Sequence, residues 1–481
     1  MDKRFPTQSL LFIDGQWREA TGGETLPVYN PATDEQLGRV AHARVADLQH
    51  AVEAAQRGFA LWRNYPPIGR ARIMRKASAL LRERAARIGP LLSLEQGKIL
   101  SEALGEVDRV AESNDWLAGE AERIYGRTIA GRAANVTQAV QQDPMGLVAA
   151  FTPWNFPMLQ LVRKIAPAVA AGCAIVVKGP EETPACCSEL VRAYADAGMP
   201  PGVINLVFGT PAEISTYLIK HPAIRKVSFT GSTAVGKQLA ALAGQHMKVM
   251  TMELGGHAPV LIFADADVEA AAQALSAYKF RNAGQSCISP TRLLVQAAVY
   301  QKFCATLVDH AKQIKVGAGL DPASTMGPLA NSRRLKAVVE LVTDAVSKGA
   351  ELLLGGKRIG TKGNFFEPTV LADVPLSARA MNEEPFGPIA LVRPFNSLTD
   401  ALVEANRLPY GLAAYAFTSS IGTARAVAAG VESGMVSINH FGLVNPESPF
   451  GGVKDSGHGY EGGPEAIEAY LQARFVTMAG L

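Results

Sequence analysis

Short apolar runs alternate with amphipathic helical patterns from Gly146 onward. The runs are rich in Val, Ile and Phe and cover residues 174–178, 203–208, 224–229, 247–253 and 259–263. Strands that alternate with helices predict a parallel, doubly wound sheet. Because each run is continuously apolar, we expect these strands to be covered on both faces.

A second series of the same kind runs from about residue 264 to about residue 450. Its candidate strands are LLVQ, LLLGG, IALVRPF, AAYAFT and VSIN. The start of the chain differs, because one alternating strand, LLFIDGQW, is followed by helical sequence rich in Ala, Leu, Glu and Arg. We therefore predict an α/β protein with a first domain at 1–125 and 145–254 and a second domain at 255–450.

The stretch 126–144 is polar with β character and interrupts both series. Together with the tail 466–481, it has the pattern of an arm that pairs with another subunit, because unpaired edge strands are a liability. A local surface hairpin accounts for the same pattern, and the sequence leaves both interpretations open.

Composition and charge indicate an ordinary globular protein. Of 481 residues, 48% are hydrophobic and 19% are charged, and the formal net charge is only +3. The basic residues are scattered, so we expect neither a nucleic-acid nor a membrane partner. The N-terminus lacks the apolar core of a signal peptide, and apolar stretches such as 166–177 are too short to span a bilayer. A cytoplasmic location is expected.

The five cysteines show neither a disulfide framework nor metal-ligand spacing, so we expect reduced thiols and no metal. Cys173, Cys186, Cys187 and Cys304 have the pattern of buried structural residues. Cys287 differs, because it lies in the Gly-bearing stretch FRNAGQSCISPTR.

Glu253 lies 34 positions before Cys287, in the similar stretch MTMELGGHAP. A carboxylate and a thiol in one pocket can divide covalent catalysis between a nucleophile and a base that activates water.

A candidate phosphate site follows the strand IRKVSF, where Gly231 and Ser232 begin the segment TGSTAVGKQ. A strand-to-helix turn presents free backbone N–H groups to an anion. The segment nearly matches a P-loop, but Gln238 stands where magnesium binding needs Ser or Thr. The usual GxGxxG fingerprint is also missing, and a plain helix N-cap by Ser232 or Thr233 is the alternative.

Lys178 ends another predicted strand and is followed by Gly179, Pro180 and Glu181. Ligands collect at the carboxyl ends of parallel strands, so Lys178 and Glu181 are candidates to bind ribose hydroxyls. A surface ion pair is the alternative.

Several motifs together resemble the aldehyde dehydrogenase superfamily. They are PWNFP (153–157), KGPEETP (178–184), FTGSTAVG (229–236), MELGG (252–256), NAGQSC (282–287), EEPFGP (383–388) and PFGGVKDSG (449–457). The likeness covers the whole chain. It implies that the first domain binds a dinucleotide, that the second is catalytic, and that the arm makes a homodimer or homotetramer.

The resemblance also implies catalytic roles. Cys287 matches the nucleophile that forms a thiohemiacetal and then a thioester, and Glu253 matches the base that activates water for hydrolysis. Asn155 matches the amide that stabilises the oxyanion with the backbone N–H of Cys287.

For the cofactor, the resemblance implies NAD. Lys178 and Glu181, with Gly179 and Pro180 between them, match the adenosine ribose site. The remaining matches are Gly231 and Ser232 at the pyrophosphate, Trp154 and Leu254 beside it, and Glu384 and Phe386 at the nicotinamide ribose. A carboxylate at position 181 repels a 2′-phosphate, which predicts NAD over NADP, although Lys178 leaves NADP use open.

Arg163 and Arg281 match positions at which semialdehyde dehydrogenases bind a substrate carboxylate, and guanidinium groups suit that role. Several stretches are closest to 2-oxoglutarate semialdehyde dehydrogenases. Val444 and Asn445 replace the serine that is typical of succinate-semialdehyde enzymes, so Asn445 is a candidate substrate residue. Succinate semialdehyde, or a broader range of aldehydes, is the alternative.

The sequence does not favour two alternative functions. A cysteine hydrolase needs a histidine base, and His257 beside Gly255 and Gly256 shows no sign of being one. A catalytically inactive homologue would lack the thiol, the carboxylate or the amide, and all three are present.

Overall fold

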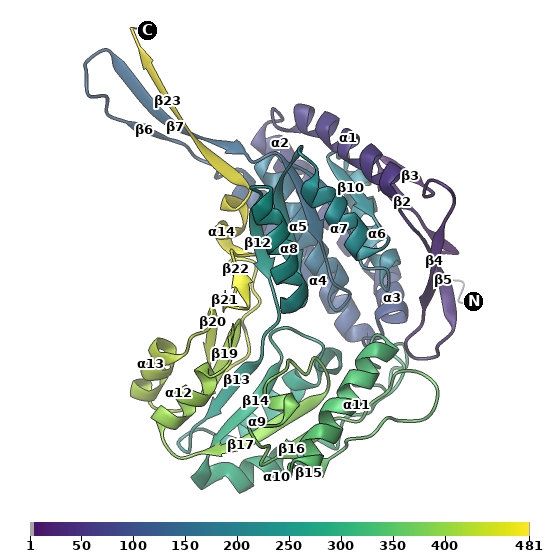
Figure 1. The fold of residues 1–481 in the computed structure, drawn as a ribbon, viewed down its shortest axis with the longest axis vertical. Helices are drawn as coiled ribbons and strands as arrows, with labels where there is room; N and C mark the ends of the chain where they lie inside the picture. The colour runs from purple at the N-terminus through teal and green to yellow at the C-terminus, as the bar shows by residue number, and fades with distance from the viewer. Residues whose placement is uncertain (1–3, 481) are drawn as a thin grey trace.

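The structure is a computed structural model that describes residues 4–480. Two β-sheets with their helices form two lobes, and a narrow third sheet projects from the first lobe (Figure 1). A large cleft between the lobes is lined by residues of both. None of the described helices is both long and apolar enough to cross a membrane.

The first lobe contains an eight-stranded sheet whose central strands are parallel. In spatial order its strands are β22 (Gly457–His458), β12 (Val249–Glu253), β11 (Ile224–Thr230), β8 (Leu147–Phe151), β9 (Ala174–Lys178), β10 (Ile204–Val207), β2 (Leu11–Ile13) and β3 (Gln16–Arg18). Only the edges are antiparallel, at β22 and at β2 and β3. The predicted parallel sheet is confirmed, and every residue of β8, β9 and β10 is buried.

Helices cover this sheet. They are α1 (Val45–Trp62), α2 (Pro67–Glu83), α3 (Ala85–Gln96), α4 (Leu100–Ala121), α5 (Pro157–Ala171), α6 (Pro184–Ala197), α7 (Pro211–Lys220), α8 (Thr233–Gln245) and α14 (Gly463–Glu468). A small sheet of β1 (Gln8–Ser9), β5 (Gln36–Ala41) and β4 (Thr25–Tyr29) precedes them.

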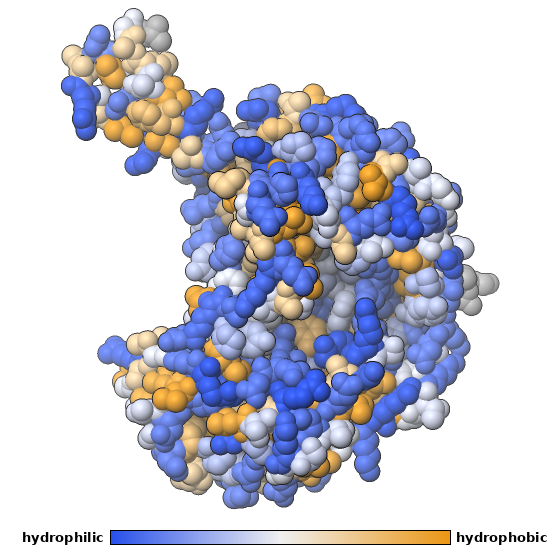
Figure 2. Space-filling view, viewed as in Figure 1, coloured by the Kyte–Doolittle hydropathy of each residue, from blue (hydrophilic) through white to orange (hydrophobic). Residues whose placement is uncertain are grey.

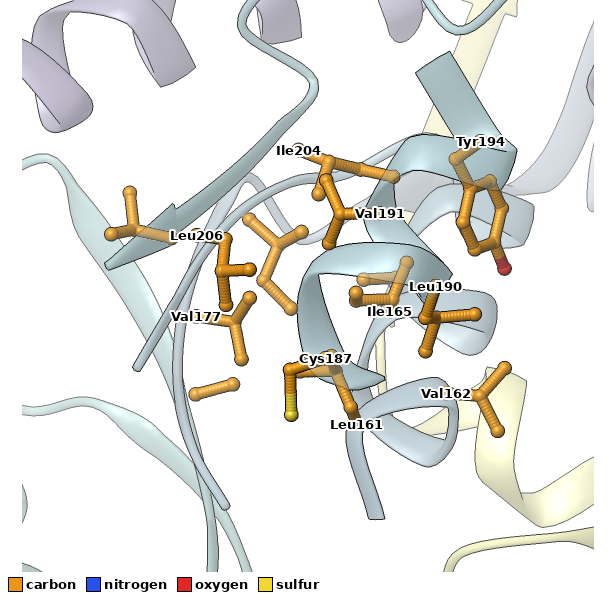
Figure 3. Packing of buried hydrophobic residues seen from close by; sticks show 14 of the residues in the cluster. Leu161, Val162, Ile165, Val177, Cys187, Leu190, Val191, Tyr194, Ile204 and Leu206 are labelled. Atoms are coloured by element: carbon orange, nitrogen blue, oxygen red, sulfur yellow. The ribbon is translucent and has the colours of Figure 1, made fainter. Parts of the chain in front are cut away.

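Helix α5 is buried along its whole length. Figure 3 shows its residues Leu161, Val162 and Ile165 packed near Cys187 and Leu190 of α6, with strands β9 and β10 on the other side. A helix that is enclosed in this way is held rigidly, because interior side chains are close-packed. Side chains of α5 that reach a cavity therefore extend from a rigid backbone.

The second lobe contains a seven-stranded sheet. Its strands are β15 (Glu351–Leu354), β16 (Thr369–Ala372), β17 (Ile389–Phe395), β14 (Pro290–Gln296), β13 (Ala258–Ile262), β19 (Ala413–Phe417) and β20 (Met435–Ile438). Its helices are α9 (Val268–Lys279), α10 (Tyr300–Ala311), α11 (Ser332–Ser347), α12 (Leu398–Asn406) and α13 (Ile421–Gly430). A two-stranded ribbon of β18 (Tyr410–Gly411) and β21 (Val453–Lys454) lies apart from this sheet.

The grouping of the run 259–263 with the first series of strands was wrong, although the domain boundary at residue 255 assigned the same run to the second domain. Strand β13 pairs with β14 and β19 in the second sheet. Apolarity alone predicts that a segment is a buried strand, whereas membership of a sheet is decided by which partners the chain brings beside it.

The projecting sheet consists of β6 (Arg127–Ile129), β7 (Val136–Pro144) and β23 (Leu471–Ala479). Strand β7 pairs with β23 over nine residues, so the tail and the 126–144 stretch form one arm. Hydrophobic side chains are visible on the arm in Figure 2, and Phe475 is 56% exposed. The arm is therefore more than a local hairpin, since it joins segments more than 300 residues apart.

Candidate active site

Cys287 follows a tight turn that ends helix α9. The turn η1 (Arg281–Gly284) contains Asn282 and Ala283 at φ 50° and 52°, followed by Gly284 at φ 70°. A Cβ at position 284 would lie 2.1 Å from the Gly387 carbonyl oxygen, so only glycine fits there. Consecutive left-handed residues cost energy, and such strain is found where a functional side chain must be presented.

As a whole residue Cys287 is partly exposed, whereas the other four cysteines are buried. Burial of the sulfur atom, with Glu384 and Glu253 nearby, raises the pKa of Cys287 to about 12, while the Arg163 guanidinium acts to lower it. The resting side chain is a neutral thiol. The predicted contrast between Cys287 and four structural cysteines agrees with this pattern of exposure.

Glu253 is the last residue of β12 and is only 2% exposed. Neither carboxylate oxygen has a hydrogen-bond partner among the described residues. Burial raises the pKa of Glu253 to about 8, against the opposing charges of Lys164 and Arg163. The Glu253 carboxylate is near enough to Cys287 to contribute to its raised pKa.

Asn155 precedes α5, and its amide points toward the Cys287 loop. Its Nδ2 donates to the Gln285 carbonyl oxygen at 3.2 Å. The Asn155 carbonyl oxygen accepts hydrogen bonds from Lys98 Nζ at 3.0 Å and Asn282 Nδ2 at 2.9 Å. The backbone and the side chain of Asn155 are thus both fixed against the turn that carries the thiol.

Two buried lysines near these residues were not predicted from the sequence. Lys98 pairs with Glu106 at 2.6 Å, and Lys164 contacts Glu461 and donates to Thr230 Oγ1 at 2.7 Å. Burial lowers the pKa of Lys164 to about 7. A lysine within the apolar sequence PMLQLVRKIAPAVAA was the available signal, because unpaired lysine is almost never fully buried.

Cys287 lies on the wall of a cavity of about 260 Å³. Arg163 of α5 and Arg281 also line it, so these two candidate substrate residues lie in the same cavity as the thiol. The aromatic lining residues are Phe156, Tyr278, Phe441 and Phe450. The rings of Tyr278 and Phe441 are stacked with centroids 4.8 Å apart.

Two features of this cavity differ from the prediction. Arg109 of α4 lines it, although the sequence gave no indication of that. Asn445 is absent from the described lining and lies in a small adjoining pocket with Arg109 and Arg163, while Val444 lines both spaces.

The large cleft between the lobes has a volume of about 1220 Å³. Six of the predicted cofactor residues line it: Trp154, Lys178, Pro180, Glu181, Gly231 and Ser232. Ser232 is the N-cap of α8 and makes no side-chain cap bond, and the first N–H groups of a helix have no partner within the helix. A Cβ at Gly231 would lie 2.4 Å from the Phe229 ring, which keeps this turn bare.

The other four predicted cofactor residues do not line that cleft. The backbone N–H of Gly179 bonds to the Val207 carbonyl, and the Phe386 ring packs edge-on against Trp154 at 5.6 Å. Glu384 Oε1 accepts the Gly256 N–H at 3.2 Å, and Glu384 is close enough to Cys287 to raise its pKa. Leu254 packs tightly against Gly236, where a Cβ would lie 2.2 Å from a Leu254 methyl carbon.

The residues around the cleft fit a dinucleotide. Lys178 and Glu181 form an ion pair of 2.5 Å, but Lys178 is only 5% exposed, so this is not a surface pair. The strand-to-helix turn offers N–H groups to a pyrophosphate. Lys237, the lysine of the near P-loop, instead pairs with Asp455 at 2.6 Å.

His257 is a buried structural residue. Its Nδ1 bonds with Thr291 Oγ1 at 2.7 Å and its Nε2 with the Ala380 carbonyl at 2.9 Å. Burial holds the pKa of His257 well below its usual range. Because both ring nitrogens are occupied, this histidine is not available to activate the thiol.

Fold and site together define a nicotinamide-dependent aldehyde oxidoreductase. The chain belongs to the aldehyde dehydrogenase family, whose model matches residues 17–476. Members of this family use NAD or NADP.

Three relatives show how close the similarity is. The chain is 45% identical to 4-(hydroxymethyl)benzenesulfonate dehydrogenase TsaD1 of Comamonas testosteroni, over 97% of each chain. It is 41% identical to 3-sulfolactaldehyde dehydrogenase of Pseudomonas putida, over 98% of this chain and 97% of that protein. The crystal structure of succinate-semialdehyde dehydrogenase from Burkholderia pseudomallei superposes with a TM-score of 0.97 at 40% identity, covering 100% of this chain and 99% of that one.

Proposed function

We propose that this enzyme oxidises a carboxylate-bearing semialdehyde to the acid, with 2-oxoglutarate semialdehyde as the favoured substrate. The observation that carries the proposal is the pair Arg163 and Arg281 on the wall of the cavity that holds Cys287. Two guanidinium groups on the wall of this cavity would bind a carboxylate, while the thiol on the same wall meets the aldehyde.

In the first half of the reaction, the Cys287 sulfur attacks the aldehyde carbon. The thiol proton passes to solvent water, and the positive charge of Arg163 favours the resulting thiolate. One Nδ2 hydrogen of Asn155 is held by the Gln285 carbonyl, which leaves the second hydrogen to stabilise the oxyanion with the Cys287 N–H. A nicotinamide dinucleotide held in the large cleft would supply the oxidation by accepting a hydride from the carbon that Cys287 has attacked.

In the second half, Glu253 removes a proton from water so that the hydroxide attacks the thioester. Burial with no hydrogen-bond partner keeps the carboxylate basic, because its pKa is about 8. The acid then leaves and Cys287 is regenerated. The pairing of a thiol with an unpartnered carboxylate supports this division of roles.

The cofactor assignments rest on the large cleft. Gly231 and Ser232 would hold the pyrophosphate, with Trp154 and Leu254 beside it. Lys178 to Glu181 would hold the adenosine ribose, and Glu384 with Phe386 the nicotinamide ribose. We propose NAD over NADP, because the Glu181 carboxylate would lie near any 2′-phosphate.

A sulfonate-bearing aldehyde is the second candidate substrate. The aromatic walls at Phe156, Tyr278 and Phe441 suit a flat or bulky substrate. Two relatives are named for sulfonated compounds, which supports a sulfonate as the anionic group. Succinate semialdehyde also stays open, since the Burkholderia enzyme carries that name.

Substitution of Arg163 or Arg281 with Met tests the proposal, because Met keeps much of the length and loses the charge. We expect kcat/KM for anionic aldehydes to fall by about 10- to 100-fold, since a hydrogen bond to a charged group contributes ~1.5–3 kcal/mol. A neutral aldehyde of equal length should be nearly unaffected. Equal losses for both kinds of aldehyde would contradict an anionic substrate. A panel of semialdehydes then identifies the preferred one.

We also propose that the arm joins subunits into a homodimer or homotetramer. Phe475 and Met478 of β23 are 56% and 44% exposed, which favours burial against another chain. Gel filtration with light scattering should report a multiple of 51.0 kDa. A monomer at micromolar concentration would contradict this assignment.

A further inference from the structure

The cavity beside Cys287 contains one more positive charge than a carboxylate needs. Its lining, among the described residues, includes Arg109, Arg163 and Arg281 but no aspartate or glutamate. The three guanidinium groups come from different elements: α4, α5 and the turn η1. Like charges repel one another, so such a cluster is costly unless an anion completes it.

Arg109 has no hydrogen bond or ion pair with any of residues 4–480, and its Nε is buried without a partner. Nearby acids are engaged elsewhere. Glu106 binds Lys98 and accepts the N–H groups of Met158 and Leu159, and Glu102 accepts the N–H of Asn282.

Two further observations place Arg109 at the outer end of the substrate space. Arg109 lines both the main cavity and the small pocket that contains Asn445, so it stands where the two spaces adjoin. Asp108, the adjacent acid on the same helix, lies 3.9 Å from Arg82, and Glu112 is exposed and lines only the small pocket. The guanidinium is therefore available to a ligand in the main cavity.

We propose that Arg109 is a third anion-binding residue that selects aldehydes whose far end carries three acceptor oxygens. A sulfonate and a 2-oxocarboxylate both meet this description with a single negative charge. Arg163 and Arg281 can satisfy the two oxygens of a carboxylate, and the rigid fork of a third guanidinium then needs another acceptor. This inference rests on the proposed function, because it assumes that the anionic end enters this cavity.

Substitution of Arg109 with Met tests the inference. We expect KM to rise by about 10- to 50-fold for 2-oxoglutarate semialdehyde or for 4-sulfobenzaldehyde, with kcat nearly unchanged, because one charge-assisted bond is lost. Succinate semialdehyde has only two acceptor oxygens at its far end, so its KM should change much less. Butanal should show no change. The three-oxygen substrate with the larger rise identifies the end group.

Two companion variants keep the test decisive. Arg109→Lys retains the charge and loses the fork, so it should restore only part of the affinity. Arg123→Met removes a positive charge just beyond the end of α4, where Arg123 pairs with Glu120 away from the cavity, and it should leave all four substrates unaffected. If Arg109→Met lowers thermal stability, the binding of benzenesulfonate or 2-oxoglutarate to the folded fraction, followed by calorimetry, gives the same comparison.

Equal effects of Arg109→Met on all four substrates, or no effect on any of them, would overturn the inference. The proposed function fails separately, if Arg163→Met and Arg281→Met do not distinguish anionic from neutral aldehydes. Discrimination by those two variants without any by Arg109→Met would leave the proposed function standing and remove only the third anion-binding residue.

Discussion

The large cleft and the cavity beside Cys287, called the small cavity below, differ in how their charged side chains are paired. Trp154 lines the large cleft, and Phe156, two residues later, lines the small cavity. In the large cleft Lys178 is paired with Glu181, and Arg333 with Glu182. In the small cavity the arginines have no acidic partner among the described residues. We therefore expect the large cleft to bind an anionic ligand through backbone N–H groups, and the small cavity to bind one through arginines that have no acidic partner.

The two arrangements suit two kinds of ligand: a cofactor that is the same in every turnover, and a substrate that the enzyme must select. Paired charges and a helix N-terminus give a stable cleft whose anion site costs little to maintain. Unpaired cations cost stability, but under the proposed function they would favour an aldehyde that supplies the missing negative charge. Cys287 lines the cavity that holds the unpaired cations, and Glu253 is the buried carboxylate that affects its pKa, so variants of these two residues are the first test.

The largest effects are expected at Cys287 and Glu253. Cys287→Ala should form no NADH, because the thioester cannot form. Glu253→Gln should release a single burst of NADH and then stall, with turnover lower by on the order of 10³-fold, because only hydrolysis needs the base. Stopped-flow absorbance of NADH separates the two outcomes. The absence of a burst from a folded Glu253→Gln enzyme would mean that the carboxylate also acts before the thioester forms.

The next largest effect is expected for Asn155→Ala. Removal of one oxyanion donor should lower kcat by on the order of 100-fold. The KM for the aldehyde and the affinity for NAD should both stay near their normal values, since neither cavity loses a charge. Steady-state kinetics and a fluorescence titration with NAD measure these quantities. Near-normal turnover of the folded variant would exclude Asn155 from the oxyanion site.

Much of the fold was predictable because buried parallel strands are continuously apolar. Strands β8 (Leu147–Phe151) and β16 (Thr369–Ala372) were missed, although each is apolar and buried. The motifs also gave Arg163, Arg281 and the residues of the large cleft. Those residues follow strands or lie in recognisable stretches, so sequence order carries their position.

The rest of the site depends on packing that sequence order does not carry. Arg109 reaches the cavity only because α4 packs beside α5. Lys164 and Glu461 are 297 positions apart, and they meet because the chain returns to the first lobe at β22, just before Glu461. The local sequence patterns around these residues do not encode contacts between segments so far apart.

A moderate effect is expected from pH. Because Glu253 must be ionised to activate water and its pKa is raised to about 8, turnover should rise as pH increases and level off above that value. Between pH 6.5 and 8.5 the increase should be about 20-fold, from the change in the ionised fraction. The size of the NADH burst should not follow this curve. An inflection near the usual pKa of glutamate would show that the carboxylate is solvated in the working enzyme.

The smallest effect is expected for Glu181→Ser. This substitution gives the large cleft a cation without an acidic partner, as in the small cavity. The substitution leaves Lys178 without its partner, so a buried cation becomes available to a 2′-phosphate. The ratio of kcat/KM for NADP to that for NAD should rise by about tenfold, which corresponds to ~1.4 kcal/mol. The KM for the aldehyde should stay constant, just as Arg163→Met should change it without altering the choice of cofactor. If the Glu181→Ser variant kept the wild-type ratio, the charge pairing of the large cleft would have no part in cofactor selection. Selection by unpaired cations would then be confined to the substrate cavity.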